Sequence, residues 1–305
     1  MNNIQMHILE EVAGLHAMPV GAYNIRLDGG SAGRNSTANI EITPKTDKNG
    51  IDIRVAAGTK NESVHIPVIL SQTGLKDLVY NDFYIGKDAD VTIIAGCGIH
   101  NSGDGDSQHD GIHTFYLEEG ARVKYIEKHY AEGDGTGEKV LNPVTVLNLG
   151  KDSYMEMDTV QIKGVDHTDR ETKATLGDGA SVVISEKLMT YGQQRAVTSF
   201  EVNLDGAGSS ANVMSRSVAK GDSRQAFLSK MFGNNKCAGH SECDAIIMDA
   251  SSVTAIPEVT ANHIDASLIH EAAIGKIAGE QIIKLMTLGL TEEEAEGQIV
   301  DGFLK

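Results

Sequence analysis

Short runs of alternating apolar and polar residues dominate the chain between about Asn39 and Val259. The runs are rich in β-branched residues and are separated by Gly, Asp and Asn, which favour turns. An alternation with a period of two puts successive side chains on opposite faces of a strand, so the pattern predicts strands rather than helices. Representative runs are Ala38–Thr43, Asp90–Ala95, Arg122–Ile126, Val182–Ser185 and Val197–Val202.

The turns between these runs repeat along the chain. In each repeat a Gly turns the chain, a small residue follows, and a new β-rich run begins. The recurrences lie roughly thirty residues apart, a period typical of solenoids whose coils stack to bury a shared core. The repeat predicts a mainly β protein built as a parallel β-helix, with an ordinary β-sandwich as the alternative. The repeating glycines are Gly86, Gly120, Gly150, Gly177 and Gly206.

Helical periodicity appears near the two ends of the chain. Residues 272–286 carry apolar side chains at helical spacing, and Gly289 follows, a residue type that commonly ends helices. Thr291 and Glu294 have the spacing of a capping box, which predicts a last helix that ends near Leu304. At the other end, residues 4–15 predict one short helix.

These patterns divide the chain into three regions. We expect an N-terminal helix and lead-in over residues 1–36, a β-helical core over 37–265 and a small C-terminal helical unit over 266–305. A helical pair appended to a solenoid normally caps its open end. The alternative is that the last helix presents its apolar stripe, which includes Ile299 and Phe303, to a partner protein.

Composition narrows the class of protein. With 43 acidic and 26 basic residues the net charge is −17, which argues against nucleic acid or an anionic membrane as a partner. No apolar run is long enough to span a membrane, no signal peptide is visible, and three cysteines do not suit a disulfide framework. We therefore expect a soluble cytoplasmic protein.

Two cysteines and a histidine lie within seven residues, as Cys237, His240 and Cys243. These residue types are ligands of zinc and iron, although a closed structural zinc site needs a fourth ligand. On a continuous strand, positions three apart point to opposite faces, so the three side chains converge only if the chain turns between them. The alternative is that the two thiols are small buried core groups.

A second polar cluster surrounds a Gly-rich stretch, Asn101–Gly111, between two β-runs. We interpret this stretch as a loop that either binds a divalent metal or is a solvated insertion. A metal here would suit a β-helical polysaccharide lyase or hydrolase, which is therefore one alternative function. No phosphate-binding loop or nucleophile elbow accompanies it. The candidate ligands are Cys97, His100, Asp104, Asp106, His109, Asp110 and His113.

The most informative segments combine Cys243 with the later pair His270 and Glu271, in otherwise apolar surroundings. A thiol with an imidazole and a carboxylate binds a soft or borderline metal, or holds sulfur. The sequence segments Cys243–Met248 and Leu268–Ile277, in this order, resemble the C-terminal half of the SufB/SufD family. This family comprises the scaffold subunits of the SUF system of iron–sulfur cluster assembly.

The resemblance implies a right-handed parallel β-helix that serves as a scaffold, not an enzyme, and holds a transient iron–sulfur cluster or iron. It implies cluster assembly at Cys243, His270 and Glu271, and a SUF-type ABC ATPase as the partner that docks on the C-terminal helices. Because this short chain combines residues of the SufB and SufD types, we expect one gene product to fill both roles as a homodimer. A purely structural interaction module, with Cys243 as a core thiol, is the remaining alternative.

Overall fold

The computed structural model describes residues 1–305, which form twenty strands and three helices. The elements are, in chain order, α1 (Asn3–Ala13), β1 (Ala22–Leu27), β2 (Gly30–Asn35), β3 (Ile40–Pro44), β4 (Gly50–Val55), β5 (Lys60–Leu70), β6 (Lys76–Ile85), β7 (Asp90–His100), β8 (Ser107–Leu117), β9 (Arg122–Glu132), β10 (Lys139–Leu141), β11 (Val144–Leu149), β12 (Tyr154–Lys163), β13 (His167–Leu176), β14 (Ser181–Thr190), β15 (Arg195–Leu204), β16 (Ser210–Ala219), β17 (Arg224–Gly233), β18 (Ala238–Ile247), β19 (Ser252–Ala261), β20 (Ser267–Gly275), α2 (Gly279–Thr287) and α3 (Glu292–Phe303).

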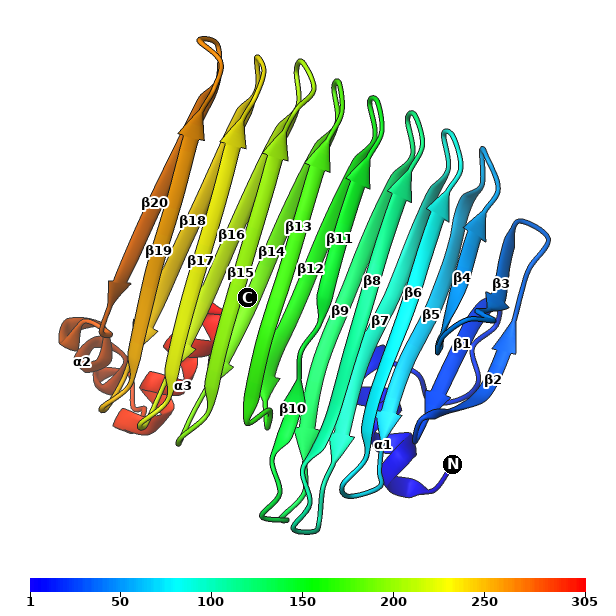
Figure 1. Cartoon of the computed structure of the whole chain (residues 1–305). Helices are drawn as coiled ribbons and strands as arrows, with labels where there is room; N and C mark the ends of the chain where they lie inside the picture. The colour runs from blue at the N-terminus through cyan, green and yellow to red at the C-terminus, as the bar shows by residue number, and fades with distance from the viewer.

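The strands build a parallel β-solenoid with two facing sheets (Figure 1). Sheet A has the order β2-β1-β5-β7-β9-β12-β14-β16-β18-β20, and sheet B has the order β19-β17-β15-β13-β10-β8-β6-β4-β3. Strand β11 continues β10 between β8 and β13, and the break between them falls at Asn142 and Pro143. Each coil contributes one strand to each sheet, which confirms the predicted solenoid.

The sequence repeat corresponds to the register between coils. Asp90 in β7 pairs with Arg122 in β9, and Ser210 in β16 pairs with Ala238 in β18. Gly120 lies at the corner where the chain passes from sheet B to sheet A, with φ at 67°, and a Cβ there would lie 2.3 Å from Oδ1 of Asp88 on the preceding coil. The small residue of each repeat is fully buried at this corner; these residues are Ala89, Ala121, Ser153, Ala180 and Ser209.

A continuous hydrophobic core of 37 residues fills the space between the sheets, from Ala22 near the N-terminal end to Cys243 near the other. Inward and outward side chains alternate along most strands, as strand geometry requires. In the core, Phe83 and Phe115 stack with their ring centroids 4.2 Å apart. Stacking between coils therefore supplies the burial that no single coil provides.

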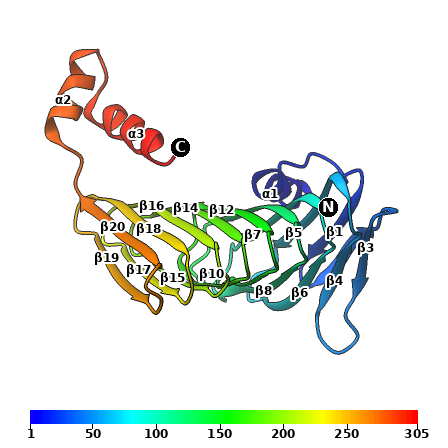
Figure 2. The same cartoon turned by 90° about the horizontal axis from the view of Figure 1, so that it is seen from above.

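Helix α1 covers sheet A near the N-terminal end of the solenoid (Figure 2). Its buried residues Ile8, Leu9 and Val12 pack against the sheet, and Gly98 in β7 allows the close approach. A Cβ on Gly98 would lie 2.0 Å from Cγ2 of Ile8. The structure confirms the predicted N-terminal helix, and its capping box joins Asn2 and Gln5.

The C-terminal boundary differs from the prediction. Residues 267–275 form strand β20 in register with β18, and the first C-terminal helix begins only at Gly279. Pairing with an existing strand outweighs the helical spacing of the apolar residues after Ala272. The last helix follows the prediction, because Thr291 and Glu294 form the capping box of α3.

Helix α3 lies over the outer face of sheet A, while α2 stands away from the sheet, and together they leave the open end of the solenoid uncovered (Figure 2). Val300 and Leu304 of α3 are buried in a small cluster with Val218 of β16. The expectation that these helices cap the open end is therefore wrong. A nearby strand surface was available to the apolar stripe, so the terminal coil keeps an exposed edge.

Candidate functional site

Cys243 lies in β18, one coil from the C-terminal end, with Ser215 of β16 and Ala272 of β20 as its register partners. Its side chain points into the solenoid and is 1% exposed. Burial, followed by the nearby negative charge of Glu186, raises the pKa of Cys243 to about 12. The thiol is therefore protonated at neutral pH in the isolated chain, and it becomes a ligand when a metal displaces the proton.

His270 lies in β20 and pairs in register with Ser241, which is buried inside the solenoid. His270 and Cys243 therefore point inward from neighbouring strands, two positions out of register, an offset that places Cα atoms about 7–8 Å apart. Both ring nitrogens of His270 are shielded from solvent and have no hydrogen-bond partner. Burial lowers the pKa of His270, which favours a neutral imidazole able to bind a metal.

Glu271 points to the opposite face. It pairs with Glu242 on the outside of sheet A, and its carboxylate lies 3.8 Å from Nε2 of His240. Neighbouring residues of a strand point to opposite sides, so His270 and Glu271 do not converge. The structure therefore brings together two of the three predicted cluster-assembly residues within one chain, Cys243 and His270.

The predicted grouping of Cys237, His240 and Cys243 does not form. Strand β18 is continuous from Ala238, so His240 lies on the outer face while Cys243 lies inside. His240 instead contacts Asn212 through Nδ1 at 3.1 Å. Cys237 is buried in the core at the corner before the strand. Gly239 does not turn the chain here, because β18 pairs over its whole length with β16.

The cluster near residue 100 is also divided by the fold. His109 and His113 belong to β8 and point into the solenoid, whereas Asp104 and Asp106 are exposed in the turn before it. The long loop expected over Asn101–Gly111 is therefore only the short turn 101–106, and a lyase site that combines these acids and histidines is wrong. Cys97 is buried in the interior, and His100 pairs with Glu132 outside. No group of three or more metal-binding side chains is assembled anywhere in the chain.

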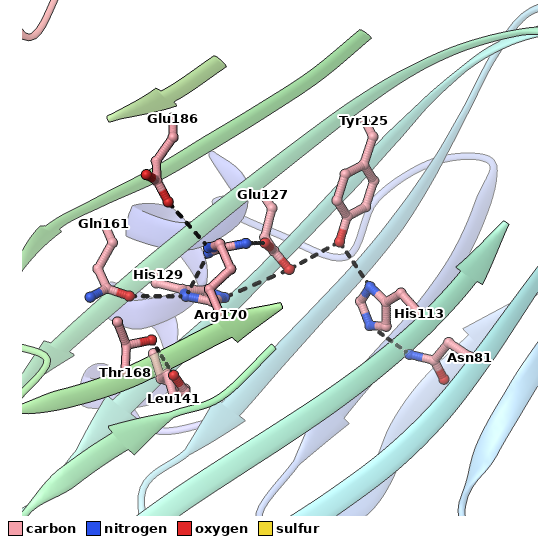
Figure 3. Close-up of polar contacts among 10 residues, drawn as sticks. All are labelled: Asn81, His113, Tyr125, Glu127, His129, Leu141, Gln161, Thr168, Arg170 and Glu186. Atoms are coloured by element: carbon pink, nitrogen blue, oxygen red, sulfur yellow. Dashed lines mark hydrogen bonds and ion pairs between the residues drawn. The ribbon is translucent and has the colours of Figure 1, made fainter. Parts of the chain in front are cut away.

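A buried polar network that sequence reasoning missed occupies the middle of the solenoid (Figure 3). Its centre is Arg170 of β13, which lies between Glu127 of β9 and Glu186 of β14. The guanidinium also contacts Nδ1 of His129 at 3.2 Å. All four side chains are buried. Although burial opposes ionisation, the positive charge of Arg170 holds the pKa of Glu127 well below its usual value.

The network extends toward both ends of the solenoid. On one side, the Tyr125 hydroxyl donates to Glu127 at 3.0 Å and contacts His113 at 2.8 Å, and the other nitrogen of His113 contacts Asn81 at 3.2 Å. On the other side, the Ser215 hydroxyl donates to Glu186 at 2.7 Å. Because Ser215 is the register partner of Cys243, the buried polar network extends to the strand position beside Cys243.

Ile299 and Phe303, the predicted docking residues, are partly buried against the cluster that holds α3 to sheet A. The more exposed apolar side chains of the helical pair lie on and just after α2. They are Ile283, Met286 and Leu288, which are 62%, 42% and 76% exposed. None of the helices is both long and apolar enough to cross a bilayer.

Residues 80–303 match the family described as "SUF system FeS cluster assembly, SufBD core domain". This match covers more than half of the chain, including the coils that carry Cys243 and His270. The chain belongs to the SufBD family. The resemblance inferred from the C-terminal sequence segments is thereby confirmed, and it extends over most of the solenoid.

Several curated SufBD relatives are archaeal. A protein of Methanothermobacter thermautotrophicus named "Iron-sulfur cluster assembly SufBD family protein" is 33% identical over 72% of this chain and 53% of its own length. A protein of Archaeoglobus fulgidus with the same name is 30% identical over 85% of this chain and 69% of its own length. One from Pyrococcus horikoshii is 27% identical over 89% and 83%. The chain spans about half the length of its Methanothermobacter relatives.

SufBD membership gives the interior site a context. In this chain neighbouring strands at the C-terminal end of the core domain place the Cys243 thiol and the His270 imidazole inside the solenoid and the Glu271 carboxylate outside it. Thiolate and imidazole are both known ligands of iron–sulfur clusters, so Cys243 and His270 fit such a cluster in chemical type.

Proposed function

We propose that this chain is a scaffold on which iron–sulfur clusters are built and passed on, in the cytoplasm, with a SUF-type ABC ATPase supplying the energy. The observation that carries the proposal is the pairing of Cys243 with His270, whose two ring nitrogens are buried and unpartnered at the uncovered end of a SufBD core domain. Buried polar atoms are nearly always satisfied, so an imidazole without partners indicates that something else binds there.

The two ligands have complementary roles. The Cys243 thiol loses its proton when it binds iron or accepts sulfur, and the resulting thiolate is a soft donor. His270 donates a neutral nitrogen and leaves the net charge of the cargo unchanged. Two ligands hold a cluster less firmly than four thiolates do, which suits a scaffold that must release its product. Glu271, on the outer face, is a harder donor suited to incoming Fe²⁺.

We propose further that two copies meet at the terminal coil. Strands β19 and β20 are the outer strands at this end, and no other strand pairs with their free edges. Their side chains Ile256 and Ile269, on the outer faces of the two terminal strands, are 53% and 52% exposed, and exposed apolar side chains beside a free edge favour association. A homodimer here would bring a second Cys243 and His270 to the same seam and complete the ligand set.

The ATPase partner is proposed to dock on the C-terminal helices. The exposed side chains Ile283 and Leu288 of this unit offer an apolar contact, while Ile299 and Phe303 hold α3 in place behind it. Ile283→Asp should abolish co-purification with a SUF-type ABC ATPase and leave the β-core melt unchanged, whereas Phe303→Asp should also loosen α3. Ile264→Asp, at an even more exposed isoleucine outside the helices, is the control. Retained binding in Ile283→Asp would exclude α2 as the contact.

One observation favours a second function, a purely structural interaction module: Cys243 is part of the main hydrophobic core and almost fully buried. A core thiol of this kind resists iodoacetamide for as long as the protein is folded. A scaffold thiol becomes reactive when the ATPase partner opens the assembly. Alkylation of Cys243 in the presence of the ATPase and ATP, and not in their absence, would therefore favour the scaffold.

The decisive experiment is anaerobic co-expression with a SUF-type ATPase, followed by iron and sulfide analysis of the purified complex. Cys243→Ser should lose both iron and sulfide, because a hydroxyl is a poor soft-metal and sulfur ligand. His270→Gln should lower both, and Glu271→Ala should lower iron more than sulfide. Cys237→Ser is the matched control, because it removes a buried thiol one corner away. Wild-type iron and sulfide in Cys243→Ser would refute the assignment.

A further inference from the structure

A polar groove of about 1040 Å³ runs along the corner where the chain passes from sheet A to sheet B. One wall is the Gly-rich loop 133–138, which stacks on the turn 101–106: the amide of Gly135 donates to the carbonyl of Asn101, and that of Gly137 donates to Gly103. These two loops project beyond the shorter turns of the following coils (Figure 1). The groove is the space beside these longer loops, above the shorter turns of the following coils.

Basic residues line the floor of the groove in a column. Four strands of sheet B begin with one: Lys139 in β10, His167 in β13, Arg195 in β15 and Arg224 in β17. His167 pairs in register with Arg195, and Arg195 with Arg224. Adjacent strands lie about 4.8 Å apart, so the two arginines lie side by side at the starts of neighbouring strands.

The two arginines lack acidic partners. Lys139 is neutralised by Asp166, whose carboxylate lies 2.9 Å from its Nζ. The guanidinium groups of Arg195 and Arg224, in contrast, take part in no ion pair or side-chain hydrogen bond. Both side chains are exposed, and two further acids, Glu138 and Asp222, line the groove without contacting them. The result is a pair of neighbouring like charges, neither of which forms an ion pair.

Elsewhere the same strands avoid this arrangement. Six positions further along, Lys173, Glu201, Lys230 and Glu258 follow one another in register on β13, β15, β17 and β19, with alternating charge. Lys230 and Glu258 lie 3.3 Å apart. Like charges directly opposite destabilise a sheet, and opposite charges stabilise it. The column at the strand starts departs from this pattern, in a protein whose net charge is −17.

We propose that the groove binds a small phosphate-bearing molecule, with its phosphoryl group held between Arg195 and Arg224. A phosphoryl dianion matches two guanidinium forks in both charge and geometry. His167 extends the column beside Arg195, and the 39% exposed ring of Tyr191 offers a flat surface to the rest of the ligand. The groove is as large as typical small-molecule sites, which measure roughly 300–1,000 Å³. The site is separate from Cys243 and His270 and does not depend on the scaffold role.

Calorimetric titration at low ionic strength tests the proposal, with inorganic phosphate, pyrophosphate and phenyl phosphate as probes and citrate as a carboxylate reference. Saturable binding of a phosphate probe, tighter than that of citrate, is expected. Tighter binding of phenyl phosphate than of either inorganic probe would identify an organic ester as the ligand, and the reverse order would identify free phosphate or pyrophosphate. Absence of saturable binding by all three up to about 10 mM would overturn the proposal.

Two double variants locate the site. Arg195→Gln with Arg224→Gln should weaken phosphate binding about tenfold or more, because both charge-assisted contacts are lost. Lys173→Gln with Lys230→Gln removes the same charge from strands β13 and β17 of the same sheet, away from the groove, and should leave binding unchanged. Equal weakening in both double variants would mean that net charge alone attracts the anion, and the site would be wrong.

A stability readout keeps the test informative. Without ligand, the arginine double variant should melt at a higher temperature than the wild type, since repulsion along the column is removed. Phosphate should raise the melting temperature of the wild type and not that of the variant. If the double variant fails to fold, Arg195→Lys is the substitute. It keeps the positive charge but loses the paired guanidinium donors, and it should still weaken binding. Undiminished binding in Arg195→Lys would count against the phosphoryl geometry.

Discussion

The two ends of the solenoid are built differently. The N-terminal end finishes in two short antiparallel hairpins, β1–β2 and β3–β4, and helix α1 covers sheet A nearby. The C-terminal end stops at two full-length parallel strands, β19 and β20. A strand edge presents unpaired backbone groups, which proteins usually cover or shorten to prevent association. Only one end has this protection. This difference in strand length and cover is what the homodimer proposed above rests on.

The same contrast holds inside the solenoid. In the N-terminal half, both nitrogens of His113 are bonded, to Asn81 and to the Tyr125 hydroxyl. In the terminal coil, neither nitrogen of His270 has a partner. A satisfied buried group holds the fold together, whereas an unsatisfied one is a cost that a ligand or partner removes. The interior therefore changes from a structural lining to a candidate binding site along its axis.

The strongest way to test the structural role of the lining is Arg170→Met. This substitution leaves Glu127 and Glu186 buried without their shared positive charge, and it should lower the free energy of unfolding by about 3–5 kcal/mol. Urea unfolding followed by circular dichroism measures the loss. Lys173→Met, on the exposed face of the same strand, should cost less than about 0.5 kcal/mol.

A compensated variant separates lost charge pairing from lost packing. Adding Glu127→Gln and Glu186→Gln to Arg170→Met removes the unpaired charges and should restore much of the lost stability. A loss below about 1 kcal/mol in Arg170→Met alone would mean that water reaches this network. The interior would then be a solvated channel rather than a structural lining.

The second prediction concerns the uncovered end. Ile256→Lys with Ile269→Lys puts a charge on the outer face of each terminal strand and should weaken self-association about a hundredfold, which corresponds to about 2.7 kcal/mol. Analytical ultracentrifugation over a range of concentrations measures the change. Ala32→Lys, an exposed position on the outermost strand at the protected end, should have no effect on the mass. An equal loss in both variants would remove the distinction between the ends.

Local patterns were sufficient to predict the solenoid. The Gly turn and its buried small residue recur at five successive corners that share one steric requirement, so the signal lies within a few residues. The capping box of α3 is equally local. The boundary at Gly275 was missed because residues 267–275 become a strand only by pairing with β18, which is distant in sequence.

The candidate site was predictable in part. Cys243 and His270 were identified by residue type and are neighbours inside one chain, but Glu271 was grouped with them although adjacent strand positions face opposite ways. The ion pair of Arg170 with Glu127 joins residues 43 positions apart, and sequence alone does not give that register. A signal was nevertheless present, since Glu127 follows Tyr125 at an inward position of an alternating strand.

The smallest effect compares the two histidines. Burial lowers the pKa of His113 to about 4, whereas the unfolded chain takes up this proton near pH 6.5. The unfolded state therefore binds more protons between these values, so the stability due to neutral His113 is complete above pH 6.5 and falls as the pH decreases toward 4. Between pH 7 and 5 the loss should be about 2 kcal/mol, and His113→Gln should abolish it. The pKa of His270 is also lowered by burial, but this ring is less deeply buried than that of His113, so protonating it costs less. His270→Gln should therefore change the pH dependence of the monomer much less than His113→Gln. Urea unfolding at pH 7, 6 and 5 measures both slopes. Equal slopes in the two variants would show that the two ends of the interior are alike in solvation, and the contrast between a sealed lining and an open site would fail.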